Sequence, residues 1–330
     1  MIYLLYGEET YLLETKLKKI RKEFGETVKG INFVQIDEGN ISEIISDMET
    51  PAFGYPTKLI IARNTGLFKK EKKISKTKTS DAGKNANSLS DKIANYILDH
   101  KELFKEAVTL VFIEEEAEKN NLYKAIETVG EVTQFELLKL PQLIDNIKKI
   151  CGAYQVKIDN ETTKYFIECC GTNMQDLINE IRKLIEYAGS GGTITKEAID
   201  KLSIKQLDSV IFDLTDNLGR RDISKSLEVL NNLLYSKEPI QKILITLYNH
   251  FKKLYIVKMA EKYHKDLATS MNLKPNQLFL TTKYKTQARY FKLGELRKIL
   301  QELIELDANY KVGLIDLNIG LEAILCRYCS

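Results

Sequence analysis

Several residue types that usually carry chemistry are scarce in this sequence. The 330 residues include no tryptophan and 3 histidines. Because histidine is the side chain that most readily acts as a general acid or base near neutral pH, few candidates for that role are present. Neither Gly-x-Ser-x-Gly nor His-Glu-x-x-His, the marks of a hydrolase nucleophile and a zinc protease, occurs in the chain. His100, His250 and His264 are scattered, which is typical of surface or packing residues. We therefore expect no catalytic residue.

Long apolar runs and metal-binding patterns are also missing. No run approaches the roughly 20 apolar residues of a membrane span, and residues 1–6 read as a strand rather than an export signal. The 5 cysteines are an odd number, and a reducing, cytoplasmic location with unpaired thiols is expected. Cys326 and Cys329 have Cys-x-x-Cys spacing, but no second pair of ligands is suitably placed for zinc. We expect no metal and no cofactor.

The overall charge gives no strong indication of a nucleic-acid partner. Lys and Arg number 49 against 46 Asp and Glu, for a net charge of +3, whereas a dedicated duplex-DNA binder usually has a stronger basic bias. Residues 69–91 are rich in Lys, Ser, Thr, Asn and Asp and poor in apolar residues, which predicts a solvated loop. This loop is either a basic patch near DNA phosphates or a solubilising surface.

The first part of the chain alternates between strand and helix patterns. Strands alternating with helices favour a parallel sheet with crossover helices, which is an α/β fold. Strands are predicted at residues 2–6, 33–36, 58–62, 108–113 and 132–135, and helices at 10–24 and 41–48.

From about Pro141 the strand patterns end, and apolar residues recur at helical spacing. A small helical domain comes first, followed after Ser203 by a helical bundle whose apolar stripes are expected to form its core. Helices are predicted at residues 143–154, 160–170, 174–187 and 195–201, then at 208–218, 223–235, from Pro239 onward, 296–306 and 314–328.

The opening strand, turn and helix stand where an ATPase would carry its phosphate-binding loop. Such a loop needs several glycines, a lysine for the phosphates and a hydroxyl for magnesium. Here Gly7 is the one glycine, Glu8 and Glu9 add negative charge, and no Gly-Lys-Ser/Thr occurs in the chain. The strong strand at 108–113 runs into Glu114–Glu116, where an ATPase would hold magnesium. Without the loop, these acids are expected to be structural or solvated.

Five segments together resemble the delta subunit family of the bacterial DNA polymerase III clamp loader. The resemblance runs in order over essentially the whole chain, and it includes the degenerate phosphate loop. The segments are Tyr3–Leu12, Thr50–Gly54 with the following Lys58–Arg63, Gly171–Leu184, Phe212–Leu218 and Asp307–Gly313.

The resemblance implies an AAA+-like α/β domain at 1–139, a helical lid at 140–204 and a helical collar at 205–330. Gly171-Thr172-Asn173 is followed by Met174 rather than a sensor arginine, and no Ser-Arg-Cys finger is present. The family binds the sliding clamp (the beta subunit) and opens it for primed DNA. Through the collar it joins the tau/gamma ATPase and delta-prime subunits in the polymerase III nucleotidyltransferase complex, without hydrolysing ATP itself. The alternative is an AAA+ ATPase with an atypical nucleotide site.

In that family a Leu-Phe pair enters a pocket on the clamp, and the matching residues here are Leu67 and Phe68. The pair follows a predicted strand and precedes a polar segment, so we expect it at an edge or a tip. Two large apolar side chains in adjacent positions make a compact anchor for an interface. The alternative is that both residues pack inside the first domain.

Overall fold

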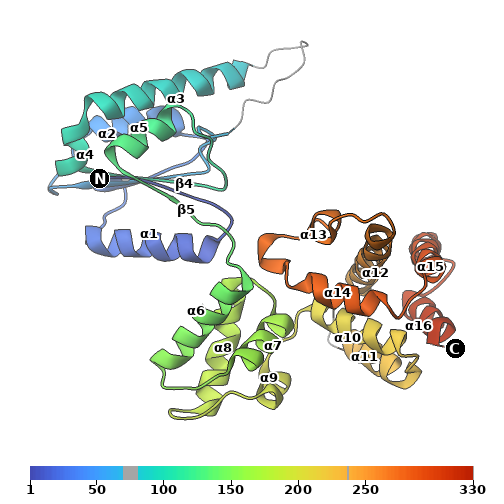
Figure 1. Ribbon diagram of the computed structural model, residues 1–330. Coiled ribbons are helices and arrows are strands. Elements are labelled where there is room, and N and C mark those ends of the chain that lie inside the picture. The colour runs from blue at the N-terminus through green and yellow to red at the C-terminus, as the bar shows by residue number, and fades with distance from the viewer. Residues whose placement is uncertain (70–80, 236–237, 330) are drawn as a thin grey trace. The chain divides into compact units, whose positions relative to one another are not determined.

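The computed structural model describes residues 1–69, 81–235 and 238–329 (Figure 1). The chain forms two compact units, Met1–Leu137 and Leu138–Ser330, and each is described by itself. The predicted boundary at residue 139 lies next to the division between the units. The further division at residue 204, between a lid and a collar, stays a prediction.

The first unit is built on one five-stranded parallel sheet with the strand order β2-β3-β4-β1-β5. The α/β architecture expected from the alternating pattern is confirmed. In the register of the central strands, Leu4 lies opposite Phe112 on one side and Val132 on the other. The strands are β1 (Ile2–Tyr6), β2 (Phe33–Ile36), β3 (Lys58–Arg63), β4 (Val108–Glu114) and β5 (Glu131–Gln134).

Helices cover both faces of this sheet. Successive side chains of a strand point to opposite faces, and here both faces carry apolar side chains that the helices bury. Leu5 and Val111 share one apolar cluster with Leu17, which lies on α1 (Thr10–Phe24). Leu4 and Phe112 belong to a second cluster on the face covered by the other helices (Figure 1). Those helices are α2 (Ile44–Glu49), preceded by the 3-10 turn η1 (Ile41–Glu43), and α3 (Asp81–Asp99), α4 (Lys101–Glu106) and α5 (Asn121–Val129).

The lysine-rich segment differs in part from its prediction. Residues 70–80 lie outside the described part of the chain, but residues 81–91, expected to be loop, form the first half of α3. The second half of α3 buries Ile93, Ala94 and Ile97 in the core. Tertiary packing of that apolar stripe supports a helix whose polar first turns carry little periodic signal of their own.

The second unit is helical in its described residues, apart from a single bridge between Lys157 and Thr193. Side chains of Asp159, Asn173 and Thr195 cap three helices by accepting a backbone N–H, and Thr195 is the cap that the sequence predicts. Pro239 is the residue before its helix rather than the first helical residue. The first helices are α6 (Leu140–Ala153), α7 (Asn160–Cys170), α8 (Met174–Ala188) and α9 (Lys196–Leu202).

The remaining helices pack around one large apolar core that runs from Ile211 to Tyr328. The short elements α13, η2 and α14 were not predicted, because their apolar residues are few and irregularly spaced. In the described residues, no helix combines the length and the apolar character needed to cross a bilayer. These helices are α10 (Leu207–Gly219), α11 (Ile223–Tyr235), α12 (Ile240–Lys262), α13 (Leu267–Ser270), η2 (Pro275–Gln277), α14 (Leu280–Ala288), α15 (Leu293–Lys311) and α16 (Leu317–Cys329).

Candidate functional site

The candidate site lies where three neighbouring strands of the first unit end. β3, β4 and β1 are adjacent in the sheet, and in parallel sheets the carboxyl ends of the strands share one edge, the usual place for a binding site. Gly7 follows β1 and Glu114 ends β4, while Leu67 and Phe68 come four and five residues after β3 ends at Arg63. The sequence features singled out for function are thus brought to one edge.

The turn after β1 uses its backbone N–H groups internally. The N–H of Gly7 donates to the Glu114 carbonyl at 3.2 Å, that of Glu9 to the Phe135 carbonyl at 3.1 Å, and that of Thr10 to the Glu8 carbonyl at 3.1 Å. A phosphate-binding loop needs such groups to point at the ligand instead. The turn therefore closes on the protein itself.

Close packing leaves no room for a side chain at Gly7. Its φ is +133°, and a Cβ built there would lie 2.2 Å from the Phe135 carbonyl oxygen. Glu9, which stands at the start of α1, is buried. A close backbone crossing and a buried acid thus occupy the space where a nucleotide phosphate would need room and donors.

Glu114 is the acid of the Glu114–Glu116 run that enters the structure, since Glu115 and Glu116 are exposed. Its Oε1 accepts hydrogen bonds from the Thr65 N–H at 2.8 Å and the Thr65 hydroxyl at 2.6 Å. Burial raises the pKa of this carboxyl, and the hydrogen bonds from Thr65 oppose the rise. The side chain ties the end of β4 to the segment that follows β3.

That segment carries Leu67 and Phe68, and the structure buries both side chains. They are 4% and 1% exposed and belong to the core cluster of the first unit. The ring of Phe68 meets that of Phe112 edge to face, with centroids 5.4 Å apart. The expected position at an edge or tip is therefore wrong for the side chains, which pack inside the domain. The assignment of the pair to clamp binding stays a prediction.

The backbone of this segment is held by a short series of specific contacts. The Glu118 N–H donates to the Phe68 carbonyl at 3.0 Å, and Asn120 Nδ2 donates to the Leu67 carbonyl at 2.8 Å. Gly66 takes a φ of +75°, which glycine adopts without the strain of an L side chain. These contacts and the burial of both side chains together hold the segment against the first unit.

Sequence reasoning missed these tethering residues. Asn120 could have been predicted from its local sequence, because an Asn before an apolar helix is a common N-cap. Its Oδ1 does accept the Tyr123 N–H at 3.0 Å. The pairing of Thr65 with Glu114 had none, since the two residues are 49 positions apart.

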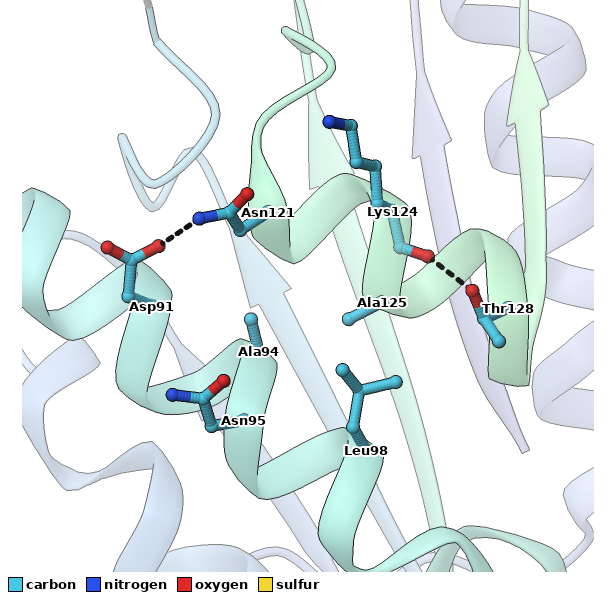
Figure 2. Close-up of a pocket in the computed structure, with 8 residues that line it drawn as sticks. All are labelled: Asp91, Ala94, Asn95, Leu98, Asn121, Lys124, Ala125 and Thr128. Carbon is cyan, nitrogen blue, oxygen red and sulfur yellow. Dashed lines mark hydrogen bonds between the residues drawn. The ribbon is translucent and has the colours of Figure 1, made fainter.

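An open groove of about 470 Å³ runs between α3 and α5 beside the segment (Figure 2). Asn121 Nδ2 donates to Asp91 Oδ1 at 2.9 Å at one end, and the Thr128 hydroxyl donates to the Lys124 carbonyl at 2.8 Å at the other. Asp91 and Asn121 directly follow Ser90 and Asn120, and Asn120 Nδ2 also lies 3.4 Å from Ser90 Oγ. The groove therefore lies next to Asn120, whose side chain donates to the Leu67 carbonyl. The residues that line the groove form no cluster of acids or bases suited to catalysis.

Metal binding finds no support in the described ranges, where no group of three or more His, Cys, Asp or Glu residues is placed to hold an ion. Burial also makes the thiols poor nucleophiles, since it raises the pKa of Cys151 to about 11 and that of Cys170 to about 12.

Phe53 is a large exposed apolar residue away from the candidate site. It is 91% exposed and lies in the turn before Lys58, the first residue of β3, whereas the candidate site lies where the strands end.

Comparisons with known proteins agree on one family. Residues 3–98 match the family described as "DNA polymerase III, delta subunit", and residues 208–328 match its C-terminal domain. The chain is 26% identical to the DNA polymerase III subunit delta of Bacillus subtilis (strain 168), over 99% of this chain and 92% of that protein. It is 25% identical to the probable DNA polymerase III subunit delta of Aquifex aeolicus (strain VF5), over 96% and 87%.

A solved structure described as the Bacillus subtilis DNA clamp loader delta protein has a similar fold. The TM-score is 0.71 at 24% identity, and the match covers 99% of this chain and 95% of that one. The likeness therefore extends over both units.

Proposed function

Because the chain belongs to the family of DNA polymerase III delta subunits, we propose that it binds the sliding clamp and opens it for loading onto primed DNA during replication. The observation that carries the proposal is the full-length match to delta subunits, combined with a Leu-Phe pair on the segment that follows β3. Leu67 and Phe68 would enter a pocket on the clamp. The subunit would act in the cytoplasm as a non-catalytic part of the polymerase complex.

The same proposal includes that this subunit does not hydrolyse ATP. The support is the turn at Gly7, whose N–H groups are bonded internally, and the buried Glu9 beside it. Calorimetric titration with MgATP should give no binding at millimolar nucleotide. Micromolar binding by the isolated chain would favour the alternative, an ATPase with an atypical nucleotide site.

Burial of the pair adds a step to clamp binding. Leu67 and Phe68 are inside the core in this conformation, so they would have to leave it before they could enter a clamp pocket. The hydrogen bonds from Glu118, Asn120 and Thr65 would be lost or remade in that step. The apparent affinity is then the intrinsic affinity reduced by the fraction of molecules with the segment released.

Burial also decides how the anchor should be tested. Replacing both residues by Ala would remove core volume and destabilise the domain by several kcal/mol, so lost binding would be ambiguous. Phe68→Leu is a milder change, and Phe104→Leu is its matched control, since Phe104 is also 1% exposed in the same cluster. Each should cost about 1–2 kcal/mol of unfolding free energy.

The two variants should separate in a clamp-binding assay by surface plasmon resonance. We expect Phe68→Leu to raise the rate of dissociation from the clamp about tenfold or more, since a hot-spot aromatic contributes at least ~2 kcal/mol. Its lost core packing acts instead on the released fraction and hence on the association rate. Phe104→Leu should leave the dissociation constant within about twofold, a change of less than ~0.5 kcal/mol. Equal effects of the two variants would show that Phe68 acts through stability alone.

The second unit would hold the subunit in the loader. Val312, Leu314 and Ile319, at the junction of α15 and α16, are 69%, 76% and 64% exposed. Adjacent exposed apolar side chains of this size favour a protein interface. We assign them to contact with the tau/gamma ATPase or delta-prime subunits, and charged substitutions there should prevent co-elution with those subunits in gel filtration.

A further inference from the structure

A second groove, of about 310 Å³, opens among the first four helices of the second unit. It lies between the ends of α6 and α8, two helices that contact each other (Figure 1). Its floor is apolar and buried, and its walls are exposed. The floor consists of Val156 and Ile185, and the walls consist of Tyr154, Arg182, Glu186, Gly189 and Ser190.

Hydrogen bonds between the two segments hold the walls of this groove in place. The Gly191 N–H donates to the Gln155 carbonyl at 3.0 Å, and the Ser190 hydroxyl donates to Gln155 Oε1 at 2.9 Å. A Cβ built at Gly192 would lie 2.1 Å from the Ala188 carbonyl oxygen, so the turn after α8 is closely packed. The shape of the groove is therefore set by the chain itself, without a ligand.

Two helix C-termini meet at this groove, and neither is balanced by a basic residue. Tyr154 is the C-cap of α6 and Gly189 is the C-cap of α8. Each C-terminus carries about half a negative elementary charge, which a nearby Lys, Arg or His stabilises. The last turns of α6 and α8 contain no basic residue, and that of α8 contains the acid Glu186. The ends of both helices therefore favour a cation from outside.

Arg182 also lines the groove, but it does not neutralise Glu186. The two residues are one turn apart on α8, yet among the residues that the structure describes no ion pair within 4.0 Å joins them. An arginine that precedes the acid is the weaker order for such a pair. Glu186 and the two helix ends, at about half a charge each, exceed the charge of Arg182 by about one unit. The groove is therefore negative.

Tyr154 adds an aromatic face to this negative groove. Its side chain is 55% exposed. Within the described ranges no Lys or Arg lies over its ring, whereas the Nζ of Lys201 lies 5.7 Å from the ring centroid of Tyr187. An aromatic face attracts a cation, and the planar guanidinium of arginine stacks on it. The groove thus combines an aromatic face, an acid and an apolar floor.

We propose that this groove binds an arginine side chain of a protein partner. The guanidinium would stack on the ring of Tyr154 and donate hydrogen bonds to Glu186, and its aliphatic stem would lie on the apolar floor. Because five of the seven lining residues are exposed, the groove is too open to enclose a free small molecule. The proposal concerns the second unit alone and does not depend on Leu67 and Phe68.

The test uses the full chain with isotope-labelled methyl groups and follows the NMR signals of Val156 and Ile185. The probe is a Gly-Arg-Gly peptide blocked at both ends and titrated at constant ionic strength. We expect saturable shifts at both floor residues, with a dissociation constant of about 1–10 mM for one side chain. The same peptide with citrulline, which keeps the shape of arginine without its charge, should bind at least about fivefold more weakly. Ile199, buried nearby on α9 but outside the lining, should not shift.

Four variants and one control define the roles of the walls. Glu186→Gln should weaken binding about threefold to fivefold, the upper range for an exposed ion pair, while Glu228→Gln, an exposed acid on α11, should have no effect. Tyr154→Leu should weaken binding about twofold to fivefold through the lost stacking. Tyr187→Leu, at 58% exposure, should leave it unchanged. Arg182→Gln should strengthen binding, because it removes a competing cation.

Four results would overturn the proposal, provided that circular dichroism shows the variants to be folded. One is that the floor methyl groups do not shift with the arginine peptide, or shift equally with citrulline. Another is an equal effect of Glu186→Gln and Glu228→Gln. Binding of a blocked Gly-Glu-Gly peptide that is lost in Arg182→Gln would identify an anion site instead. Agmatine, a free guanidinium with an alkyl amine, would identify a small-molecule ligand if it bound more than about tenfold tighter than the peptide.

Discussion

Thr65→Val should strengthen clamp binding while it weakens the fold. The hydroxyl of Thr65 donates to Glu114 Oε1 at 2.6 Å and accepts the Leu67 N–H at 3.3 Å. A hydrogen bond to a charged group contributes about 1.5–3 kcal/mol, and valine keeps the side-chain shape without it. Because the bond exists when the segment is docked, its loss destabilises that state alone.

The expected size follows from the same figures. A loss of about 1.5 kcal/mol from the docked state multiplies the released fraction about tenfold, since 1.4 kcal/mol is a factor of ten. While the docked state predominates, the apparent dissociation constant for the clamp falls by the same factor. The unfolding free energy should fall by a similar ~1.5 kcal/mol.

Surface plasmon resonance against the clamp measures the affinity, and hydrogen exchange of the amides of residues 65–68 reports release. Thr128→Val is the matched control, because its hydroxyl donates to the Lys124 carbonyl at 2.8 Å at an exposed position of α5 and does not touch the segment. The reasoning fails if exchange at 65–68 becomes faster in Thr65→Val and clamp affinity does not rise.

Two further predictions concern stability. His250 is buried among Thr215, Gln287 and aromatic rings, and desolvation lowers its pKa from 6.5 to about 3, with the charges of Lys253 and Lys283 adding to the effect. Because the unfolded state takes up the proton first as pH falls below about 6.5, urea unfolding at pH 5 should show a stability roughly 2 kcal/mol lower than at pH 7 from this residue. The difference should shrink in His250→Gln, and an undiminished difference would assign the acid sensitivity elsewhere. Gly7→Ala should cost more than ~2 kcal/mol in thermal unfolding, because its Cβ would overlap the Phe135 carbonyl. Gly25→Ala, with φ of +93° and no atom within 4 Å of the new Cβ, should cost about 1 kcal/mol from backbone strain alone, and equal losses would contradict the packing argument for Gly7.

Local pattern was sufficient for most of the architecture. The five strands were predicted to within a residue or two at each end. For β1, β3 and β4 the reason is that a buried parallel strand is apolar along most of its length. Helices with a regular apolar stripe, such as α8, were equally well predicted. No helix was predicted between residues 49 and 139, so α3, α4 and α5 were missed, as were α13 and α14 in the second unit. The first turns of α3 and the short α14 depend on packing against distant parts of the chain rather than on their own periodicity.

The sequence by itself determined that no phosphate loop is present and that a Leu-Phe pair follows the third strand, because both are statements about residue identity and order. Only the tertiary structure decided which way Leu67 and Phe68 point, since a loop side chain has no period to reveal its direction. The same holds for Thr65 and Glu114, which meet because β3 and β4 are neighbours in the sheet. The direction of a loop is set by such long-range contacts, and these exist only once the chain is folded.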